Sequence, residues 1–207
     1  IRFVSPHPIG FRQDLVQAFT YLPKLCSHIH FPMQSGSDRI LMAMNRHYDL
    51  RHYEELLRYA REKMPGLSIT SDIIVGFPGE TREDFEKTLE LVRRTKYSAL
   101  FTFIYSRRSG TAAEKLPDPI PAEEKSRWFR ELLDTQGAIG SELLKNYVGK
   151  TLRVLAEDEG KTPGTLSCRA EDNTIVEVAA PPEMIGEFLQ VRITAAMNWA
   201  LRGERAE

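Results

Sequence analysis

The feature that most constrains the fold is an alternation of strand-like and helix-like segments, which runs from residue 1 to about residue 147. Short apolar runs predict four strands, at residues 1–5, 28–33, 68–75 and 99–106. Helix-like spacing of apolar residues occupies the intervening and following stretches, at residues 11–22, 37–44, 49–64, 81–95 and 122–147. Because strands that alternate with helices usually pair in parallel, the pattern predicts an α/β domain. Four strands suffice for a small open sheet or for half of a closed barrel, which has about eight.

Two of the predicted helices carry further signals. Residues 49–64 place one apolar set on a single helical face, namely Tyr53, Leu56, Leu57, Ala60 and Met64. Residues 81–95 begin with Thr81 and Asp84 in the spacing of a capping box. The same helix is predicted to turn Phe85, Leu89 and Val92 inward.

From Val148 the pattern changes to short alternating runs that are separated by Gly, Pro, Asn and acidic residues. The runs lie at residues 150–158, 164–170, 174–180 and 187–196. Such spacing predicts a small antiparallel β-barrel or sandwich. We therefore expect two domains, at residues 1–147 and 148–207.

Composition limits the class of protein and its partners. The chain has 42% hydrophobic and 28% charged residues, a net charge of −1, and no apolar run near the ~20 residues that span a bilayer. Its two cysteines, Cys26 and Cys168, are far apart, which argues against a disulfide scaffold or a self-contained zinc site and predicts a cytoplasmic protein. Residues 148–207 hold seven basic and ten acidic residues. They therefore lack the basic surface of a domain that binds nucleic acid mainly through charge.

Polar or glycine-rich sequences follow the predicted strands. They are SPHP at residues 5–8, QSGSDR at 34–39, GFPGE at 76–80 and YSRRSGT at 105–111. Since ligands of parallel α/β sheets bind at the carboxyl ends of the strands, these stretches are the candidate site.

The strand at residues 68–75 is half polar, with Ser68, Thr70 and Asp72 on one face. A buried polar group costs free energy unless it is paired. Either this face lines a ligand cavity, or Asp72 pairs with a polar side chain of a neighbouring strand.

The turn after this strand also allows two interpretations. Gly76 and Gly79 either bring backbone N–H groups close to an anion or form an ordinary strand-to-helix turn with Pro78. A lone GxxG is weak, because the phosphate-loop pattern is absent.

Histidine, arginine and tryptophan side chains offer weaker signals. His28 and His30 share a strand face and suit a metal only if a third ligand exists, so satisfied histidines are the alternative. Arg46 and the pair Arg107–Arg108 either meet phosphates or carboxylates or form a solvated surface. Trp199 either stacks on a nucleobase or covers the end of the small barrel.

Three stretches together resemble one family. HIHFPMQSGSDRILMAMNR, TSDIIVGFPGET and FTFIYSRRSGTAA are similar to the second half of the radical S-adenosylmethionine core of methylthiotransferases, a TIM-like barrel of parallel strands. Within that family they most resemble tRNA 2-methylthio-N6-dimethylallyladenosine synthases. The segment from GKTLRVL to ITAAMNWALRGE resembles their TRAM domain, a small β-barrel that binds RNA. The first strand and SPHP fit the same family.

The resemblance implies residues that bind S-adenosylmethionine. A GxIxGxxE-like signature packs against adenosine, and here Asp72 replaces its first glycine, Ile74 and Gly76 fit, and Glu80 lies one place late. By the same resemblance the ribose or methionine part would meet Gln34, Ser35 and Ser37, the methionine carboxylate Arg46, and the adenine Tyr105. In the TRAM-like part the candidates for RNA binding are Trp199 and Arg202.

The family also needs two [4Fe–4S] clusters, one held by a CxxxCxxC loop and one by three cysteines of an N-terminal domain. Cys26 and Cys168 match neither set, so the resemblance implies a fragment that begins at the third barrel strand, without catalytic residues or metal ligands of its own, and inactive alone. The whole enzyme would add a methylthio group to C2 of an isopentenylated adenosine beside a tRNA anticodon by radical chemistry.

Other functions remain open at this point. A ribosomal-protein methylthiotransferase or one that modifies threonylcarbamoyladenosine in tRNA shares the core, although QSGSDRIL and NWALRGE favour the isopentenyladenosine enzymes. Outside the enzymes, a non-catalytic RNA-binding module or an unrelated phosphate-binding α/β protein would carry similar patterns. An open edge strand at residues 1–5 predicts a homodimer.

Overall fold

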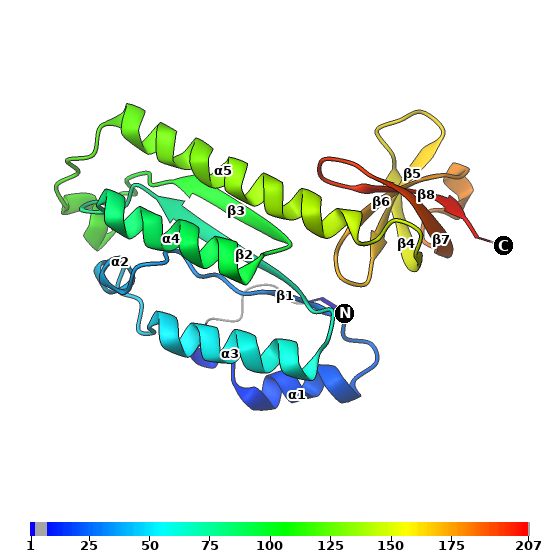
Figure 1. Ribbon diagram of the computed structural model, residues 1–207, viewed down its shortest axis with the longest axis horizontal. Helices are drawn as coiled ribbons and strands as arrows, with labels where there is room; N and C mark the ends of the chain where they lie inside the picture. The colour runs from blue at the N-terminus through cyan, green and yellow to red at the C-terminus, as the bar shows by residue number, and fades with distance from the viewer. Residues whose placement is uncertain (3–7, 207) are drawn as a thin grey trace. The chain divides into compact units, whose positions relative to one another are not determined.

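The computed structural model describes residues 1–2 and 8–206 (Figure 1). The strand expected at residues 1–5, and with it the predicted dimer edge, falls largely on residues 3–7, outside the described residues, as does most of SPHP. The chain forms two compact units. The first extends to Gln136 apart from Cys26–His28, and the second holds those three residues and everything from Gly137.

The first unit contains a three-stranded sheet in the order β1-β2-β3. The strands are β1 (His28–His30), β2 (Ser68–Val75) and β3 (Ala99–Ile104). β2 and β3 are parallel, in register from Thr70 opposite Ala99 to Val75 opposite Ile104, which confirms the predicted parallel sheet. β1 is shorter than expected. Pro32 has no N–H to donate, and beyond it the N–H of Met33 donates to the Ser71 hydroxyl (2.9 Å).

Helices alternate with these strands in the predicted order. They are α1 (Gln13–Tyr21), α2 (Asp38–Ala43), α3 (Leu50–Lys63), α4 (Arg82–Thr95) and α5 (Ala122–Lys145), with short 3-10 turns at Pro8–Gly10 and Ala112–Lys115. The capping box at the start of α4 is confirmed, because Thr81 and Asp84 each accept the other's backbone N–H. Asp49 caps α3 by accepting from the N–H of His52.

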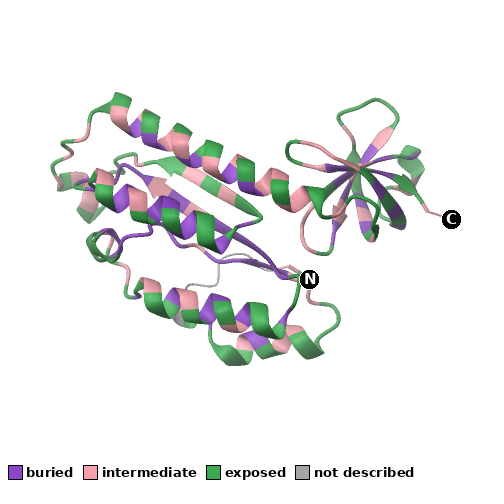
Figure 2. Ribbon diagram, viewed as in Figure 1, coloured by how far each residue is buried: buried purple, intermediate pink, exposed green. Residues whose placement is uncertain are grey.

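The core of the first unit lies between the sheet and its helices, and Figure 2 shows the buried residues along β2 and on single faces of α3 and α4. All the apolar residues predicted to face inward from α3 and α4 are buried. Tyr53 stacks on Phe31 with ring centroids 4.5 Å apart. Its hydroxyl lies 2.9 Å from the Phe31 carbonyl oxygen and 3.0 Å from the Tyr97 hydroxyl, so this fully buried polar group is satisfied.

The second unit contains a closed barrel of five strands in the order β4-β5-β6-β8-β7. The strands are β4 (Thr151–Glu159), β5 (Thr165–Ala170), β6 (Ile175–Ala179), β7 (Phe188–Ala196) and β8 (Leu201–Arg205), with a 3-10 turn at Pro182–Met184. The barrel matches the prediction in two respects and departs from it in two. It is small and built of alternating strands, but β8 is an additional strand and β6 pairs with β8 in parallel. β8 lacks an obvious alternating pattern because Gly203 fills one of its inward positions.

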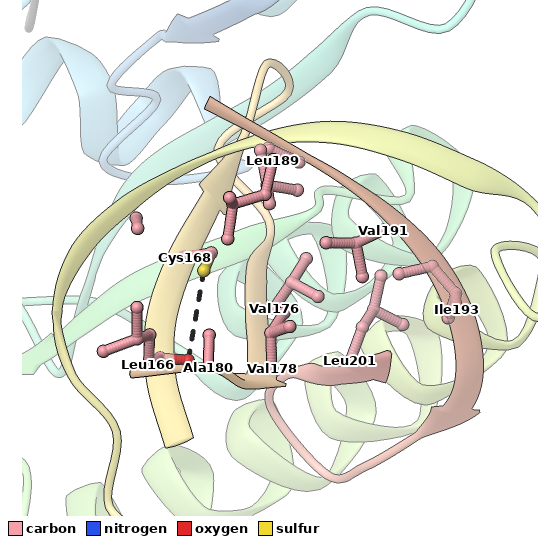
Figure 3. Packing of buried hydrophobic residues seen from close by; sticks show 12 residues of the cluster. Leu166, Cys168, Val176, Val178, Ala180, Leu189, Val191, Ile193 and Leu201 are labelled. Atoms are coloured by element: carbon pink, nitrogen blue, oxygen red, sulfur yellow. Dashed lines mark hydrogen bonds between the residues drawn. The ribbon is translucent and has the colours of Figure 1, made fainter. Parts of the chain in front are cut away.

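Inward side chains of all five strands fill the barrel (Figure 3). Gly203 is required there, because an added Cβ would lie 2.3 Å from Val191 Cγ1 and 2.7 Å from the Arg192 carbonyl oxygen. Cys168 is buried in this core, and burial raises the pKa of its thiol to about 11. Both cysteines are free thiols. Among the described residues, no helix has the length and apolar character needed to cross a bilayer.

Candidate functional site at the strand ends

A cavity of about 600 Å³ opens at the carboxyl ends of the parallel strands in the first unit. Five of the residues predicted to bind a cofactor line it, namely Gln34, Arg46, Asp72, Ile74 and Tyr105. Phe77 and Ser106, from two of the candidate stretches, also line it, and Asn45 and Phe103 complete the walls. The cavity therefore brings together side chains that follow, or belong to, three different strands.

Gln34 is held against β2 by backbone hydrogen bonds. Its N–H donates to the Asp72 carbonyl (2.8 Å) and its carbonyl accepts from the N–H of Ile74 (2.9 Å). Its φ of 71° lies in the left-handed region, which residues other than glycine adopt rarely. Such a backbone persists only where its surroundings fix it. Here the ladder to β2 does so beside the cavity.

Asp72 satisfies both interpretations that the sequence left open. It lines the cavity, and one of its carboxylate oxygens lies 3.4 Å from Nε2 of His30 on the neighbouring strand. The other ring nitrogen of His30 is hydrogen-bonded to the Thr70 hydroxyl (2.9 Å). Within the described part of the chain no group of three His, Cys, Asp or Glu could hold a metal ion. Both ring nitrogens of His30 thus lie near polar partners, and one of these partners is Asp72.

Arg46 brings a positive charge to the same cavity. Its side chain is only partly exposed, and its Nε is buried without a hydrogen-bond partner. The backbone holds the residue in place, because the Arg46 N–H donates to the Leu41 carbonyl (2.8 Å). A buried guanidinium N–H without an acceptor costs free energy, and an anionic ligand group in the cavity would supply the acceptor.

The glycine turn after β2 is closed by its own glutamate. The carboxylate of Glu80 accepts the N–H groups of Gly76 (2.5 Å) and Phe77 (3.2 Å). Glu80 is buried, and burial raises its pKa to about 7. On the open side of Gly76 lies the Lys125 side chain, which an added Cβ would meet at 2.7 Å. Since Glu80 takes the Gly76 N–H, the structure favours the ordinary-turn interpretation, and Gly76 does not line the cavity.

Ser35 and Ser37 are buried beside the cavity but do not line it. The Ser37 hydroxyl donates to Asp84 (2.6 Å), and the Ser37 N–H donates to the Ser35 hydroxyl (3.2 Å). Although burial by itself raises the pKa of Asp84, hydrogen bonds from Arg39, Ser37 and Thr81 bring it below its usual value. These residues join the start of α2 to the start of α4.

Tyr105 is fixed by three neighbours. Its hydroxyl donates to the Ala113 carbonyl (3.1 Å), and its ring meets Phe77 edge-on at 5.2 Å. The Lys125 ammonium lies 5.7 Å from the ring centroid and pairs with Asp118 (2.5 Å). Neither Phe77 nor Lys125 was identified from the sequence, because their roles depend on contacts between distant segments.

The arginine pair separates in the structure. Arg108 lines the cavity, whereas Arg107 is exposed and donates to the Leu116 carbonyl (3.2 Å). In the barrel, Trp199 is 71% exposed. It therefore does not cover the end of the barrel, which was the alternative to base stacking. The Arg202 guanidinium lies 3.7 Å from the Glu177 carboxylate.

Two family models match separate parts of the chain. Residues 1–92 match the Radical SAM superfamily and residues 145–205 match the TRAM domain. The chain is 50% identical over 98% of its length to a tRNA-2-methylthio-N(6)-dimethylallyladenosine synthase of Akkermansia muciniphila. It is 45% identical over 99% of its length to the protein of the same name from Syntrophomonas wolfei. It spans only 44% and 46% of these two relatives.

A likeness to a solved structure supports the fold alone. Coproporphyrinogen III oxidase from Escherichia coli, a radical SAM enzyme, matches 90% of this chain with a TM-score of 0.56 and 19% identity. The match covers 45% of that protein's chain.

Radical SAM proteins use S-adenosylmethionine together with an iron–sulfur cluster. The cavity suits the first group chemically, because its guanidinium, carboxylate, amide and aromatic rings are complementary to the carboxylate, ammonium, ribose and adenine of such a molecule. The chain's two cysteines are too few to hold a [4Fe–4S] cluster, which four thiolates commonly bind. The chain therefore resembles the Radical SAM superfamily over residues 1–92 and the TRAM domain over residues 145–205, and it is similar along nearly its whole length to part of the tRNA-2-methylthio-N(6)-dimethylallyladenosine synthases.

Proposed function

We propose that this chain serves a tRNA-modifying methylthiotransferase that adds a methylthio group to C2 of N6-isopentenyladenosine in the anticodon region of tRNA. Two observations support the proposal: the similarity to synthases of that name and the cavity at the strand ends. The cavity carries most weight, because it gathers a cation with an unpartnered buried Nε and a carboxylate where parallel α/β proteins bind ligands.

We assign the cavity to S-adenosylmethionine. Arg46 would bind the methionine carboxylate, and Asp72, oriented by His30, would accept hydrogen bonds from the ammonium or a ribose hydroxyl. Ile74 and Tyr105 would pack against the adenine. Gln34 would contact the ribose or methionine part, while Ser35, Ser37 and Gly76 would act by holding the walls in place. S-adenosylmethionine supplies the radical chemistry when it is bound beside a reduced iron–sulfur cluster.

Two [4Fe–4S] clusters complete the proposed enzyme, with thiolate ligands outside this chain, which has only Cys26 and Cys168. The chain alone would therefore be inactive. The barrel would contact the tRNA through Trp199 and Arg202, both of which are exposed. A cytoplasmic location follows from the tRNA substrate and the free thiols, and a homodimer through residues 1–5 stays a prediction that light scattering tests.

The cofactor assignment is tested on the chain itself. S-adenosylmethionine labelled at its methyl carbon is titrated with the protein and followed by NMR. We expect Arg46→Ala to weaken binding at least about tenfold, the size of one charge-assisted contact. Arg107→Ala is the matched control, because Arg107 is exposed and does not line the cavity. Equal binding by both variants would contradict the assignment of Arg46.

The reaction is tested on a protein that carries this sequence together with the cluster cysteines. After anoxic reconstitution it receives S-adenosylmethionine, a reductant and isopentenylated tRNA, and mass spectrometry seeks the methylthio adduct. An adduct on threonylcarbamoylated tRNA or on ribosomal protein instead would change the proposed substrate and leave the proposed reaction, methylthio transfer, in place. Formation of neither adduct nor 5′-deoxyadenosine would leave only an RNA-binding module.

A further inference from the structure

One row of polar side chains crosses the outer face of the barrel. Cross-strand pairing places Asp158 of β4 opposite Ser167 of β5, Ser167 opposite Glu177 of β6, and Glu177 opposite Arg202 of β8. The strand neighbours of Ser167, Glu177 and Arg202 are buried, so these three side chains face away from the barrel core.

A register shift puts Asp158 into this row. Ala156 faces the core and is 1% exposed, so strict alternation would turn Asp158 inward as well. The pairing of β4 with β5 shifts between these two residues, as in a β-bulge. Asp158 is consequently exposed and level with Ser167, and its Oδ1 accepts the N–H of Glu159 (2.8 Å), which orients the carboxylate.

The tip of the β7–β8 hairpin adds an aromatic wall. The turn is closed by a hydrogen bond from the Met197 N–H to the Ala200 carbonyl (2.8 Å), and it carries Asn198 and Trp199 at its tip. The hairpin tip and three members of the row, Asp158, Ser167 and Glu177, border a cavity of about 600 Å³, which Arg202 does not line. Its walls include Asp158, Ser167, Ile175, Glu177, Asn198 and Trp199.

The charge of this cavity selects what part of an RNA can enter. Three carboxylates line it, on Asp158, Glu159 and Glu177, against one lysine, Lys161. Glu177 is fixed as an acceptor, because one of its oxygens takes the Thr162 N–H (3.1 Å) and the Thr165 hydroxyl (3.0 Å). A phosphate group would be repelled here, so RNA would have to present a base to the cavity.

The donor pattern of the bases then discriminates among them. A carboxylate only accepts hydrogen bonds. Guanine offers two adjacent donors on its Watson–Crick edge, N1–H and the N2 amino group, which match the two oxygens of one carboxylate. Adenine, cytosine and uracil each place an acceptor next to their donor, which a carboxylate repels. Unpaired bases are commonly read in this way, stacked on an aromatic ring and hydrogen-bonded at that edge.

We propose that the cavity binds an unpaired guanine of the RNA, stacked on Trp199, with its two Watson–Crick donors facing the carboxylate of Asp158. This inference rests on the proposed function, in which the barrel contacts tRNA, and it adds the identity of the base that is read. Because the cavity lies on the outer face of the barrel, it is separate from the strand-end cavity of the first unit.

The test uses the whole chain and five-nucleotide RNAs that differ only at the centre, UUGUU, UUAUU, UUCUU and UUUUU, together with unmodified tRNA. Binding is followed by quenching of the exposed Trp199, while Trp128, which is 4% exposed, supplies a constant background. We expect UUGUU to bind about tenfold more tightly than the others. Asp158→Asn should reduce this preference to less than about threefold, because the amide presents one donor to the guanine.

Two further variants separate the contributions. Trp199→Ala, followed by fluorescence anisotropy of labelled RNA, should weaken binding to all four oligonucleotides, because stacking does not depend on base identity. Glu183→Gln is the matched control for Asp158→Asn, since Glu183 is an exposed carboxylate of the same barrel that does not line the cavity. This control should leave both affinity and preference unchanged.

The outcomes distinguish the inference from the proposed function. Binding of tRNA and all oligonucleotides without preference for guanine would overturn the guanine pocket and leave RNA binding intact. A preference for guanine that persists in Asp158→Asn would contradict the assignment of Asp158 as the residue that recognises the base. Absence of binding to every RNA, tRNA included, would contradict RNA binding by the barrel and remove the basis of the inference.

Discussion

The strand-end cavity and the barrel cavity are of equal size, about 600 Å³ each, but they are built by different means. The one in the first unit lies where parallel strands end, so its walls come from segments that follow different strands. The one on the barrel lies along the middle of neighbouring strands, and its walls come from cross-strand register plus a hairpin tip. Parallel connections bring strand ends together at one edge, whereas in a barrel the register alone decides which side chains meet.

The treatment of charge differs as well. The first unit buries two carboxylates next to its cavity, Glu80 at 4% and Asp84 at 3% exposure, and satisfies each with hydrogen bonds. The barrel leaves Asp158 exposed. Buried polar groups are costly to disturb and exposed ones are not. Substitutions should therefore destabilise the first unit far more than the barrel face.

The largest effect is expected for Gly36→Ala in the first unit. An added Cβ would lie 2.4 Å from Thr88 Cα and 2.7 Å from the Lys87 carbonyl oxygen, both in the backbone of α4. Because backbone cannot move aside locally, we expect a loss of about 3 kcal/mol or more in the free energy of unfolding. Denaturation followed by the fluorescence of Trp128 measures it. Gly140→Ala, where nothing lies within 4 Å, should stabilise slightly, and equal losses in both variants would contradict the explanation.

A pH-dependent effect is expected for Glu80→Gln. The pKa of Glu80 is raised by burial to about 7, so the native state keeps this proton where the unfolded chain loses it. Native stability from this group is complete below the unfolded pKa, near 4.5, and is lost as the pH rises through about 7. The free energy of unfolding of the glutamine variant, relative to that of the unsubstituted protein, should rise by about 2 kcal/mol between pH 5 and pH 8. If the free energies of unfolding of the two proteins change with pH in the same way, this explanation is wrong.

Asp84→Asn should cost about 2 kcal/mol, because it removes the charge that Arg39, Ser37 and the Thr81 N–H bind. The lowered pKa of Asp84 gives the sign of its pH dependence. Its stabilisation is present above the unfolded pKa and disappears as the pH falls below about 4. Asp158→Asn on the barrel is the matched comparison, and its unfolding free energy should change by less than about 0.5 kcal/mol. Similar costs at the two sites would break the contrast between the units.

A smaller effect than that of Asp84→Asn is expected for Tyr147→Phe in the second unit. The Tyr147 hydroxyl donates to Asp172, and the ring packs against the barrel core. Losing one hydrogen bond to a charged partner at a partly buried site should cost about 1 kcal/mol. The protein is labelled with 5-fluorotryptophan and unfolded with denaturant while fluorine NMR is recorded. The unfolding midpoint seen at Trp199 should fall, and the midpoint seen at Trp128 should stay unchanged. A change of the midpoint at Trp128 alone would show that Tyr147 stabilises the first unit and not the barrel.

Much of the strand-end site followed from local pattern. Strand alternation put Asp72 on a polar face, and the chain order put Gln34 and Tyr105 at the ends of β1 and β3, the two strands that flank β2. The partners of these residues were not predictable. Three contacts depend on a sharp turn or on packing between segments that are distant in sequence. Glu80 closes the glycine turn, Lys125 covers Gly76, and Ser37 binds Asp84 rather than lining the cavity.

The sequence by itself determined the order of the elements, the parallel sheet, the capping box of α4, the buried faces of α3 and α4, and the change to a small barrel, because period and turn residues are local properties. Only the tertiary structure decided that β8 closes the barrel beside β6, that a register shift turns Asp158 outward, and that Arg46 and Asp72 share one cavity. Register and long-range contact depend on how the buried surfaces of separate segments fit together, and that fit is not encoded within any one segment.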